Sequence, residues 1–184
     1  VNSSYKKYSQ VAARSGLTGA QAASRLISSS GLFQVRVETV RGNLTDHYDP
    51  RSKTLRLSAG VAQSPSVAAL AISAHELGHA MQDAENYFPL RLRAALVPAV
   101  NIGSYLGWIL IFIGLMLRMT DLAWLGVIVF AGGAVFALAT LPVELNASAR
   151  AKQMLTNSGM IISEEERQGV NRVLNAAALT DVAG

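Results

Sequence analysis

Cysteine is absent from all 184 residues of the sequence. The chain therefore has neither a disulfide framework nor a thiolate metal site. The absence fits a protein that works in a reducing compartment.

Charged residues are also scarce, at 15% of the chain against about 25% in ordinary soluble proteins. The deficit is concentrated in two uncharged runs, residues 94–117 and residues 122–143. Each run is longer than the roughly 20 residues that a helix needs to cross a bilayer. A buried helical hairpin of a soluble protein is the alternative, but a chain this short could hardly bury two such runs. The sequence predicts a soluble part (1–93), two transmembrane helices (94–143) and C-terminal soluble helices (144–184).

The net charge of +4 arises from basic residues that are scattered singly, with no basic stripe and little aromatic interleaving. This pattern argues against a nucleic-acid partner. Near the membrane, Arg91, Arg93, Arg150 and Lys152 flank the two runs, whereas Arg118 alone lies between them. Positive charge favours the cytoplasmic side, so we expect both soluble parts to face the cytoplasm.

Capping and turn signals predict the elements around these runs. Thr18 and Gln21 form a capping box for a helix that ends at Gly31. Alternating residues 33–40, a segment around His47 and Tyr48, and residues 54–58 predict a small β-hairpin or meander. The pair Ser64-Pro65 indicates the start of a helix that runs to about residue 86.

Beyond the first uncharged run, proline and glycine mark the expected ends of helices. The second membrane helix should end near Pro142, and a separate helix from Glu144 should stop at Gly159. Ser163 with Glu166 forms a capping box for a last helix through about residue 174.

The segment His75-Glu76-Leu77-Gly78-His79 carries the chemistry. Imidazoles four residues apart lie on one helix face and can reach a single ion, with Glu76 close enough to contact a metal-bound water. Zinc lowers the pKa of such a water, and a carboxylate then takes its proton as it attacks a carbonyl. A solvated polar turn is the plain alternative, but the flanking residues are uncharged and mostly small. Gly78 in a helix interior costs about 1 kcal/mol, which a close backbone approach would explain.

A catalytic zinc site usually has three protein ligands, so a third is expected. Glu144 is the better candidate, because it directly follows a membrane segment and heads a face of small residues; otherwise it merely marks the membrane boundary. His47 is either a turn residue or, with Tyr48, a group that supports the site or stabilises an oxyanion.

The segments GNLTDHYDPRSKTLRLS, SAHELGHAMQ and LPVELNASARA, with the two apolar runs between the last two, resemble the YugP-like neutral zinc metallopeptidases of bacteria. The resemblance implies a zinc-dependent, multi-pass peptidase of the bacterial inner membrane, with further hydrophobic helices before Val1 and after Gly184. The layout is also similar to the HtpX-type and CAAX prenyl protease group, which has an aspartate where this chain has Ser148. Asn146 or Asp83 is a candidate for the supporting role of that aspartate, and Arg150 is a further residue that could support the site or stabilise an oxyanion.

The sequence thus predicts a mainly α integral membrane protein with an HExxH zincin-like helical core, a small β element and a transmembrane hairpin. Its predicted function is that of a gluzincin-like zinc metalloendopeptidase, with a protein or peptide substrate that could align along strand 54–58 if that strand is an edge. The bilayer is a further partner, as is a membrane protein or a second copy of the chain. Two other functions remain open: an inactive metal-binding scaffold and a zinc hydrolase of a non-peptide amide.

Overall fold

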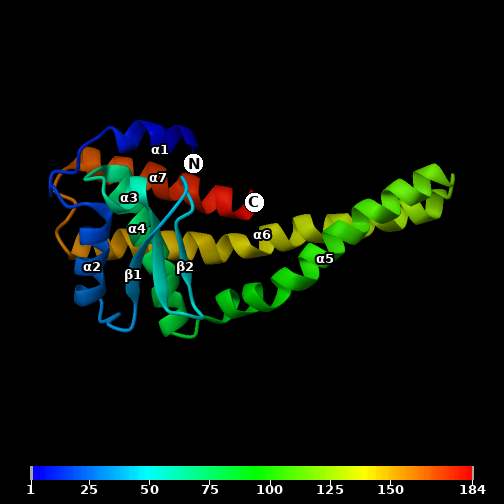
Figure 1. Ribbon diagram of the computed structural model, residues 1–184, viewed down its shortest axis with the longest axis horizontal. Helices are drawn as coiled ribbons and strands as arrows, with labels where there is room; N and C mark the ends of the chain where they lie inside the picture. Colours follow the sequence, from blue (N-terminus) through cyan, green and yellow to red (C-terminus); the bar gives the residue numbers. More distant parts are fainter. Residues whose placement is uncertain (1, 184) are drawn as a thin grey trace.

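The computed structural model describes residues 2–183 of the chain. This part folds mainly into helices with one small sheet, which confirms the predicted class. In chain order the elements are α1 (Asn2–Ser9), α2 (Gly19–Ser29), β1 (Arg36–Val40), β2 (His47–Asp49), β3 (Thr54–Ser58), α3 (Ala59–Ala62), α4 (Val67–Ala84), α5 (Phe88–Met116), α6 (Thr120–Asn157) and α7 (Glu164–Ala183). A compact body holds most of them, and α5 and α6 extend from it as a long hairpin (Figure 1).

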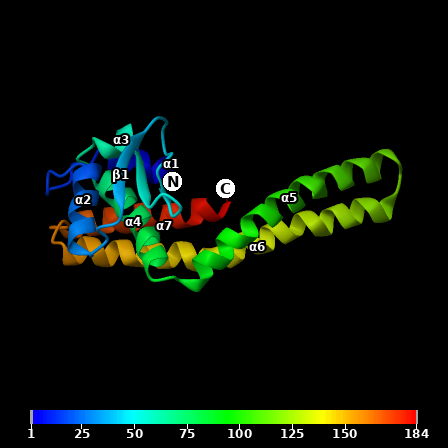
Figure 2. The ribbon, with the colours of Figure 1, turned by 60° about the horizontal axis from the view of Figure 1, so that its bottom comes forward.

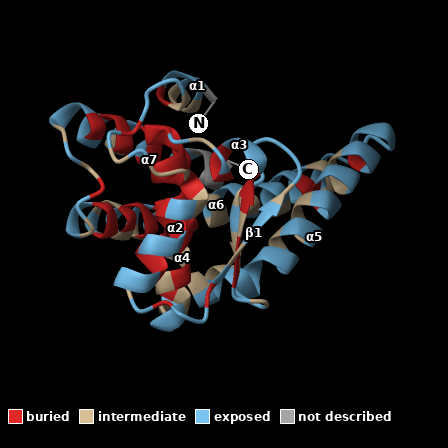
Figure 3. Ribbon diagram, turned by 60° about the vertical axis from the view of Figure 1, so that its left-hand side comes forward, coloured by how far each residue is buried: buried red, intermediate tan, exposed pale blue. Residues whose placement is uncertain are grey.

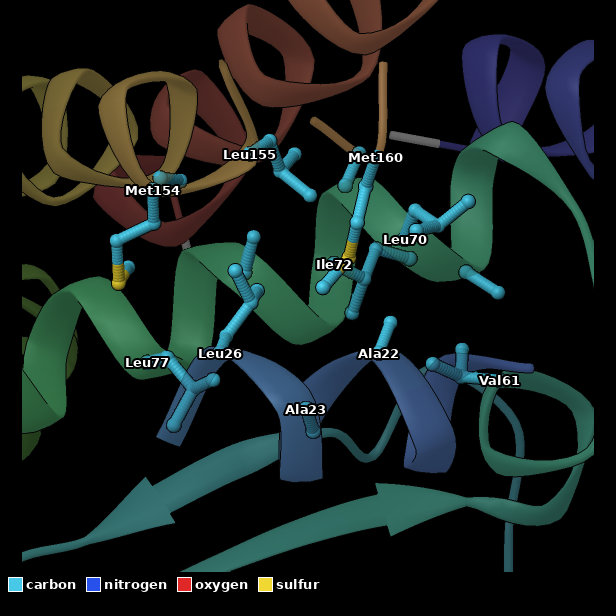
Figure 4. Close-up of a cluster of buried hydrophobic side chains, with 14 of the residues drawn as sticks. Ala22, Ala23, Leu26, Val61, Leu70, Ile72, Leu77, Met154, Leu155 and Met160 are labelled. Atoms are coloured by element: carbon cyan, nitrogen blue, oxygen red, sulfur yellow. The ribbon is translucent and has the colours of Figure 1, made fainter. Parts of the chain in front are cut away.

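Helix α4 lies at the centre of the hydrophobic core. Every residue from Val67 to Gly78 is buried, and many of them are alanines, which let neighbouring elements approach closely. Leu77 of α4 lies in one cluster with Leu26 of α2 and Leu155 of α6 (Figure 4). Full burial of a leucine side chain stabilises a fold by roughly 1.5–3 kcal/mol relative to exposure. The core therefore fixes α4, the helix that carries the HELGH residues.

The sheet has the strand order β1-β3-β2. Strands β2 and β3 form the predicted antiparallel hairpin, with Tyr48 opposite Leu55. Strand β1 pairs parallel with β3, so the three strands do not form a meander. Strand β3 is paired on both sides and offers no edge to a substrate. The edge strand next to α4 is β2 instead.

The start of α4 differs from the sequence prediction by two residues. The N-cap is Ser66, whose Oγ accepts from the backbone N–H of Ala69 at 3.2 Å. The preceding backbone is held by bonds to the N-terminal segment: the carbonyl of Ser64 accepts from Gly19, and that of Pro65 accepts from Ala13. Because of these contacts, α4 begins after Ser64-Pro65, at Val67.

The other capping predictions agree with the structure. Thr18 and Gln21 form the capping box of α2, and Gly31 has φ +70° just beyond that helix. Ser163 and Glu166 exchange the paired bonds of a capping box at the start of α7. Helix α7 continues beyond residue 174 to Ala183.

Helices α5 and α6 lie side by side along the hairpin (Figure 2). Both helices are long and apolar enough to cross a membrane. Only 6% of the apolar 18-residue stretch in each helix is buried. Most residues along the hairpin are exposed, whereas most of the buried residues lie in the body (Figure 3). The backbones of α5 and α6 come close together where Gly107 faces Gly126 and where Gly114 faces Ala123.

The second uncharged run does not end in a helix break at Pro142. Helix α6 continues through Pro142 and carries Glu144 within the same helix. A proline removes only one helical hydrogen bond, and the second half of α6 is held against α4 and α7. Gly159, with φ +66°, lies just past the end of α6, as predicted.

Candidate metal centre and active site

Helix α4 presents His75 and His79 on successive turns. The side chain of His75 is 1% exposed and that of His79 is 13% exposed. The two ring centroids are 4.9 Å apart, and the rings are nearly perpendicular. This is the arrangement expected from imidazoles four residues apart on one helical face.

Glu144 of α6 meets both imidazoles although it is distant in sequence. Its Oε2 lies 3.3 Å from Nε2 of His75 and 3.2 Å from Nε2 of His79. The three ligand atoms all lie within 4.8 Å of one another, and among the described residues this is the group that could hold a metal ion. His47 is not part of it.

Gly78 lets α4 and α6 come close enough for this contact. A Cβ at Gly78 would lie 2.4 Å from the carbonyl oxygen of Ala147 on α6, closer than atoms can approach. The close backbone approach that the sequence suggested for Gly78 is therefore present, three residues from Glu144.

Gln82 determines the tautomer of His79. Its Nε2 donates to the carbonyl of Val143 and to Oδ1 of Asn146, both at 2.9 Å, which directs its Oε1 to the histidine. Nδ1 of His79 lies 3.0 Å from that oxygen and must donate to it. A neutral His79 therefore carries its proton on Nδ1 and a lone pair on Nε2, which faces Glu144.

Ser148 does the same for His75. Its Oγ donates to the carbonyl of Leu174 at 3.2 Å, so it accepts from Nδ1 of His75 at 3.1 Å. The lone pair of a neutral His75 is likewise on Nε2. The hydroxyl of Ser148 therefore contacts the His75 imidazole directly.

The donor set fits zinc. Two imidazole lone pairs and a carboxylate oxygen that face one another without a cation would repel, and a dication between them removes that conflict. Ligand atoms about 2.1 Å from a tetrahedral zinc lie about 3.4 Å apart, close to the two separations measured from Glu144. Hydrogen bonds on the far nitrogen of each imidazole are the usual support of histidine ligands to zinc.

Glu76 lies beside this cluster and is 9% exposed. The backbone N–H of Tyr48 in strand β2 donates to its Oε2 at 3.0 Å. The edge of β2 thus holds the carboxylate in place. Because that N–H is already engaged by Glu76, it is not available to pair with a substrate strand.

Glu76, His79 and Glu144 line one cavity of about 530 Å³. The segment around β2 forms one wall of the cavity, and the first turns of α5 supply apolar side chains to another. The remaining lining residues are Asp46, His47, Tyr48, Pro50, Leu90, Arg93, Ala94 and Val97. The cavity combines a polar, titratable floor with an apolar wall.

The other predicted site residues fall into two places. His47 and Tyr48 line the cavity, but Nδ1 of His47 bonds to the Thr45 carbonyl and Tyr48 donates its hydroxyl to Asp83. Burial, and then this bond to Asp83, raise the pKa of the Tyr48 hydroxyl above its ordinary value. The single hydroxyl proton of Tyr48 is therefore used in the hydrogen bond to Asp83.

Asn146 and Arg150 do not line the cavity. Oδ1 of Asn146 accepts from Nε2 of Gln82 and from Nε of Arg150, and Arg150 also pairs with Glu85 at 2.8 Å. They form a chain of contacts that ends at His79 through Gln82. Asp83 contacts Tyr48 and Lys53 rather than a histidine.

Sequence reasoning missed Gln82 and Arg93 as site residues. Gln82 carried a usable signal, because it lies three residues after His79 and so on the same helical face. Arg93 was read only as a topology charge, yet its Nη1 donates to Oε1 of Glu144. No local pattern indicates that contact, since it joins residues on two different helices.

These features define the class of the protein: a helical chain with an apolar hairpin and a largely buried His-His-Glu group that fits zinc. The chain belongs to the family described as "Putative neutral zinc metallopeptidase", whose sequence profile matches residues 1–184. It is also 48% identical over 183 residues to the "Putative membrane protease YugP" of Bacillus subtilis (strain 168), an alignment that covers 100% of this chain and 81% of that relative. No solved structure matches the chain. The family resemblance expected from the sequence motifs is confirmed.

Proposed function

We propose that the chain is a membrane-embedded zinc metalloendopeptidase of the HExxH, gluzincin-like type. The observation that carries the proposal is the meeting of three ligand atoms, from His75, His79 and Glu144, at a cavity that His79 and Glu144 line together with Glu76. The family description names zinc and peptidase activity, and the Bacillus relative is named as a membrane protease. The substrate class we assign is protein or peptide.

Each residue of the site has a separate task in this proposal. His75, His79 and Glu144 would hold the zinc, which when bound supplies an acidified water and polarises a carbonyl. Glu76 would accept a proton at its carboxylate and later return it to the leaving amine. The backbone of Tyr48 holds Glu76 in position for both transfers. The apolar wall of α5 would exclude bulk water and contact substrate side chains.

The fold supports a membrane location for this chemistry. We propose that residues 94–143 cross the bacterial inner membrane, with residues 1–93 and 144–184 as soluble parts that face the cytoplasm. Arg93 and Glu144 touch each other, as expected if both lie at the same membrane boundary. The exposed apolar surface of α5 and α6 would then face lipid or a membrane protein partner.

The test is Glu76→Gln in the full chain purified in detergent. An amide fills the same space but cannot accept the proton, so the variant should keep its zinc and lose at least about 100-fold in hydrolysis. Glu165→Gln, an exposed position on α7, is the matched control and should match the parent. Near-parental cleavage by Glu76→Gln would reject Glu76 as the base.

The same preparation separates the other two functions. The parent is incubated with a panel of casein-derived peptides and with lipid amides. Cleavage of peptides supports the proposal, and cleavage of lipid amides alone would replace it with an amide hydrolase. Zinc binding without cleavage of either substrate would point to a scaffold.

A further inference from the structure

Arg93 connects the membrane hairpin to the metal centre. It lies near the start of α5, lines the cavity, and directs Nη1 to Oε1 of Glu144. The Glu144 side chain is completely buried, whereas that of Arg93 is 27% exposed. A carboxylate removed from water needs partners for both of its oxygens, and Arg93 is the partner of one of them.

The two oxygens of Glu144 have different surroundings. Oε2 faces both imidazole Nε2 atoms at 3.2–3.3 Å, and Oε1 faces the guanidinium. A carboxylate that is free to turn can bind a metal ion through one oxygen or through both. With Oε1 engaged by a charge-assisted hydrogen bond, only Oε2 remains available to an ion.

We infer that Arg93 is a positioning residue that restricts Glu144 to a single metal-binding oxygen. The inference rests on the proposed function and adds a role that the HExxH pattern does not contain. A catalytic zinc site usually binds three protein atoms and one water, and a second carboxylate oxygen would crowd the water position as a fifth bound atom. Arg93 therefore preserves the open position.

The positive charge of Arg93 lowers the affinity for a metal ion, whereas its hydrogen bond to Glu144 shapes the site for that ion. A guanidinium close to a dication repels it and weakens binding. Affinity alone would therefore misreport the role of Arg93, and the diagnostic quantity is the number of atoms bound to the metal. Lysine keeps the charge and can still donate a hydrogen bond to Oε1 of Glu144, so Arg93→Lys should keep Glu144 bound through one oxygen although it lacks the planar fork of arginine.

The experiment replaces zinc with Co²⁺, whose visible absorption is strong with four ligands and weaker and shifted with five. The full chain is stripped with a chelator and reloaded as parent, Arg93→Met, Arg93→Lys and Arg91→Met. Arg91 is exposed, lies on the same helix and does not line the cavity, so its variant is the matched control.

We expect Arg93→Met to bind Co²⁺ at least as tightly as the parent but to show the weaker, shifted spectrum. Arg93→Lys and Arg91→Met should keep the parental spectrum. If Arg93→Met does not fold, as judged by its melting temperature without metal, Arg93→Ala takes its place with the same expected spectrum. A parental spectrum in Arg93→Met, or in Arg93→Ala if it takes its place, overturns this inference whether or not binding is weaker. That result leaves the proposed function standing. A parent that binds no Co²⁺ overturns the proposed function as well.

Discussion

Gln82 and Ser148 contact the Nδ1 atoms of the two histidines, while the Nε2 atoms face Glu144. Both supporting residues are buried, so their hydrogen bonds do not exchange with solvent. The imidazoles are thus held in one tautomer and orientation before any ion arrives. This arrangement of the two histidines supports the proposed metal site.

Gln82→Met tests this arrangement. Methionine fills a similar volume but removes the acceptor for Nδ1 of His79, so zinc affinity should fall about 10–100-fold. Chelator competition measures the affinity, at a temperature where both chains are folded. Gln153→Met, an exposed position on α6, is the control and should bind like the parent. Equal affinities for Gln82→Met and the parent would show that the tautomer needs no support.

Sequence reasoning named the central residues of the candidate site but not the residues that hold them in place. His75, Glu76 and His79 follow from their spacing, and Glu144 follows from the return of the chain after two membrane lengths. The role of Gln82 depends on which way its amide faces, and the carbonyl of Val143, 61 residues away, decides that. Such a contact exists only in the folded chain.

Among the elements, the contact of α4 with α6 has the largest consequence for the site. It depends on the missing side chain of Gly78, next to Ala147. The helices themselves were largely predictable from caps and apolar runs. Pro142 was misleading because a proline usually ends a helix, whereas α6 continues through it and packs against α4 and α7. Ser64-Pro65 was misleading because backbone bonds to the N-terminal segment keep those residues outside the helix.

Gly78→Ala should separate α4 from α6. The added methyl would overlap the carbonyl of Ala147, so the chain should lose about 1–3 kcal/mol of stability and most of its zinc affinity. Gly132→Ala is the matched control, because nothing lies within 4 Å of a Cβ at that position of α6. Thermal unfolding and zinc titration give the two readouts. A Gly78→Ala chain that binds zinc normally would mean that the two helices can shift without loss of the site.

The main feature of the whole molecule is the contrast between the body, which contains the buried core, and the exposed apolar hairpin (Figure 3). The tip of the hairpin, between the end of α5 at Met116 and the start of α6 at Thr120, lies far from the body (Figure 1). Basic residues gather near the body rather than at the tip, where Arg118 stands alone. That asymmetry supports a cytoplasmic body.

Single cysteines at Thr120 and Arg41 test this orientation without background, because the chain has no cysteine of its own. In intact bacterial cells a membrane-impermeant thiol reagent should label Thr120→Cys only. After lysis it should label both, since Arg41 is exposed on the body. Labelling of Arg41→Cys alone in intact cells would reverse the orientation.

The measurement that bears most directly on the central claim is the zinc content of the full chain and of its ligand variants. The parent should carry close to one zinc per chain, because His75, His79 and Glu144 could supply the three ligands of one site. His75→Ala and Glu144→Ala should lose most of that zinc, whereas Glu165→Ala and His47→Ala should retain it. A Glu144→Ala chain with full zinc, together with a His47→Ala chain that has lost it, would contradict the account and assign a three-histidine site.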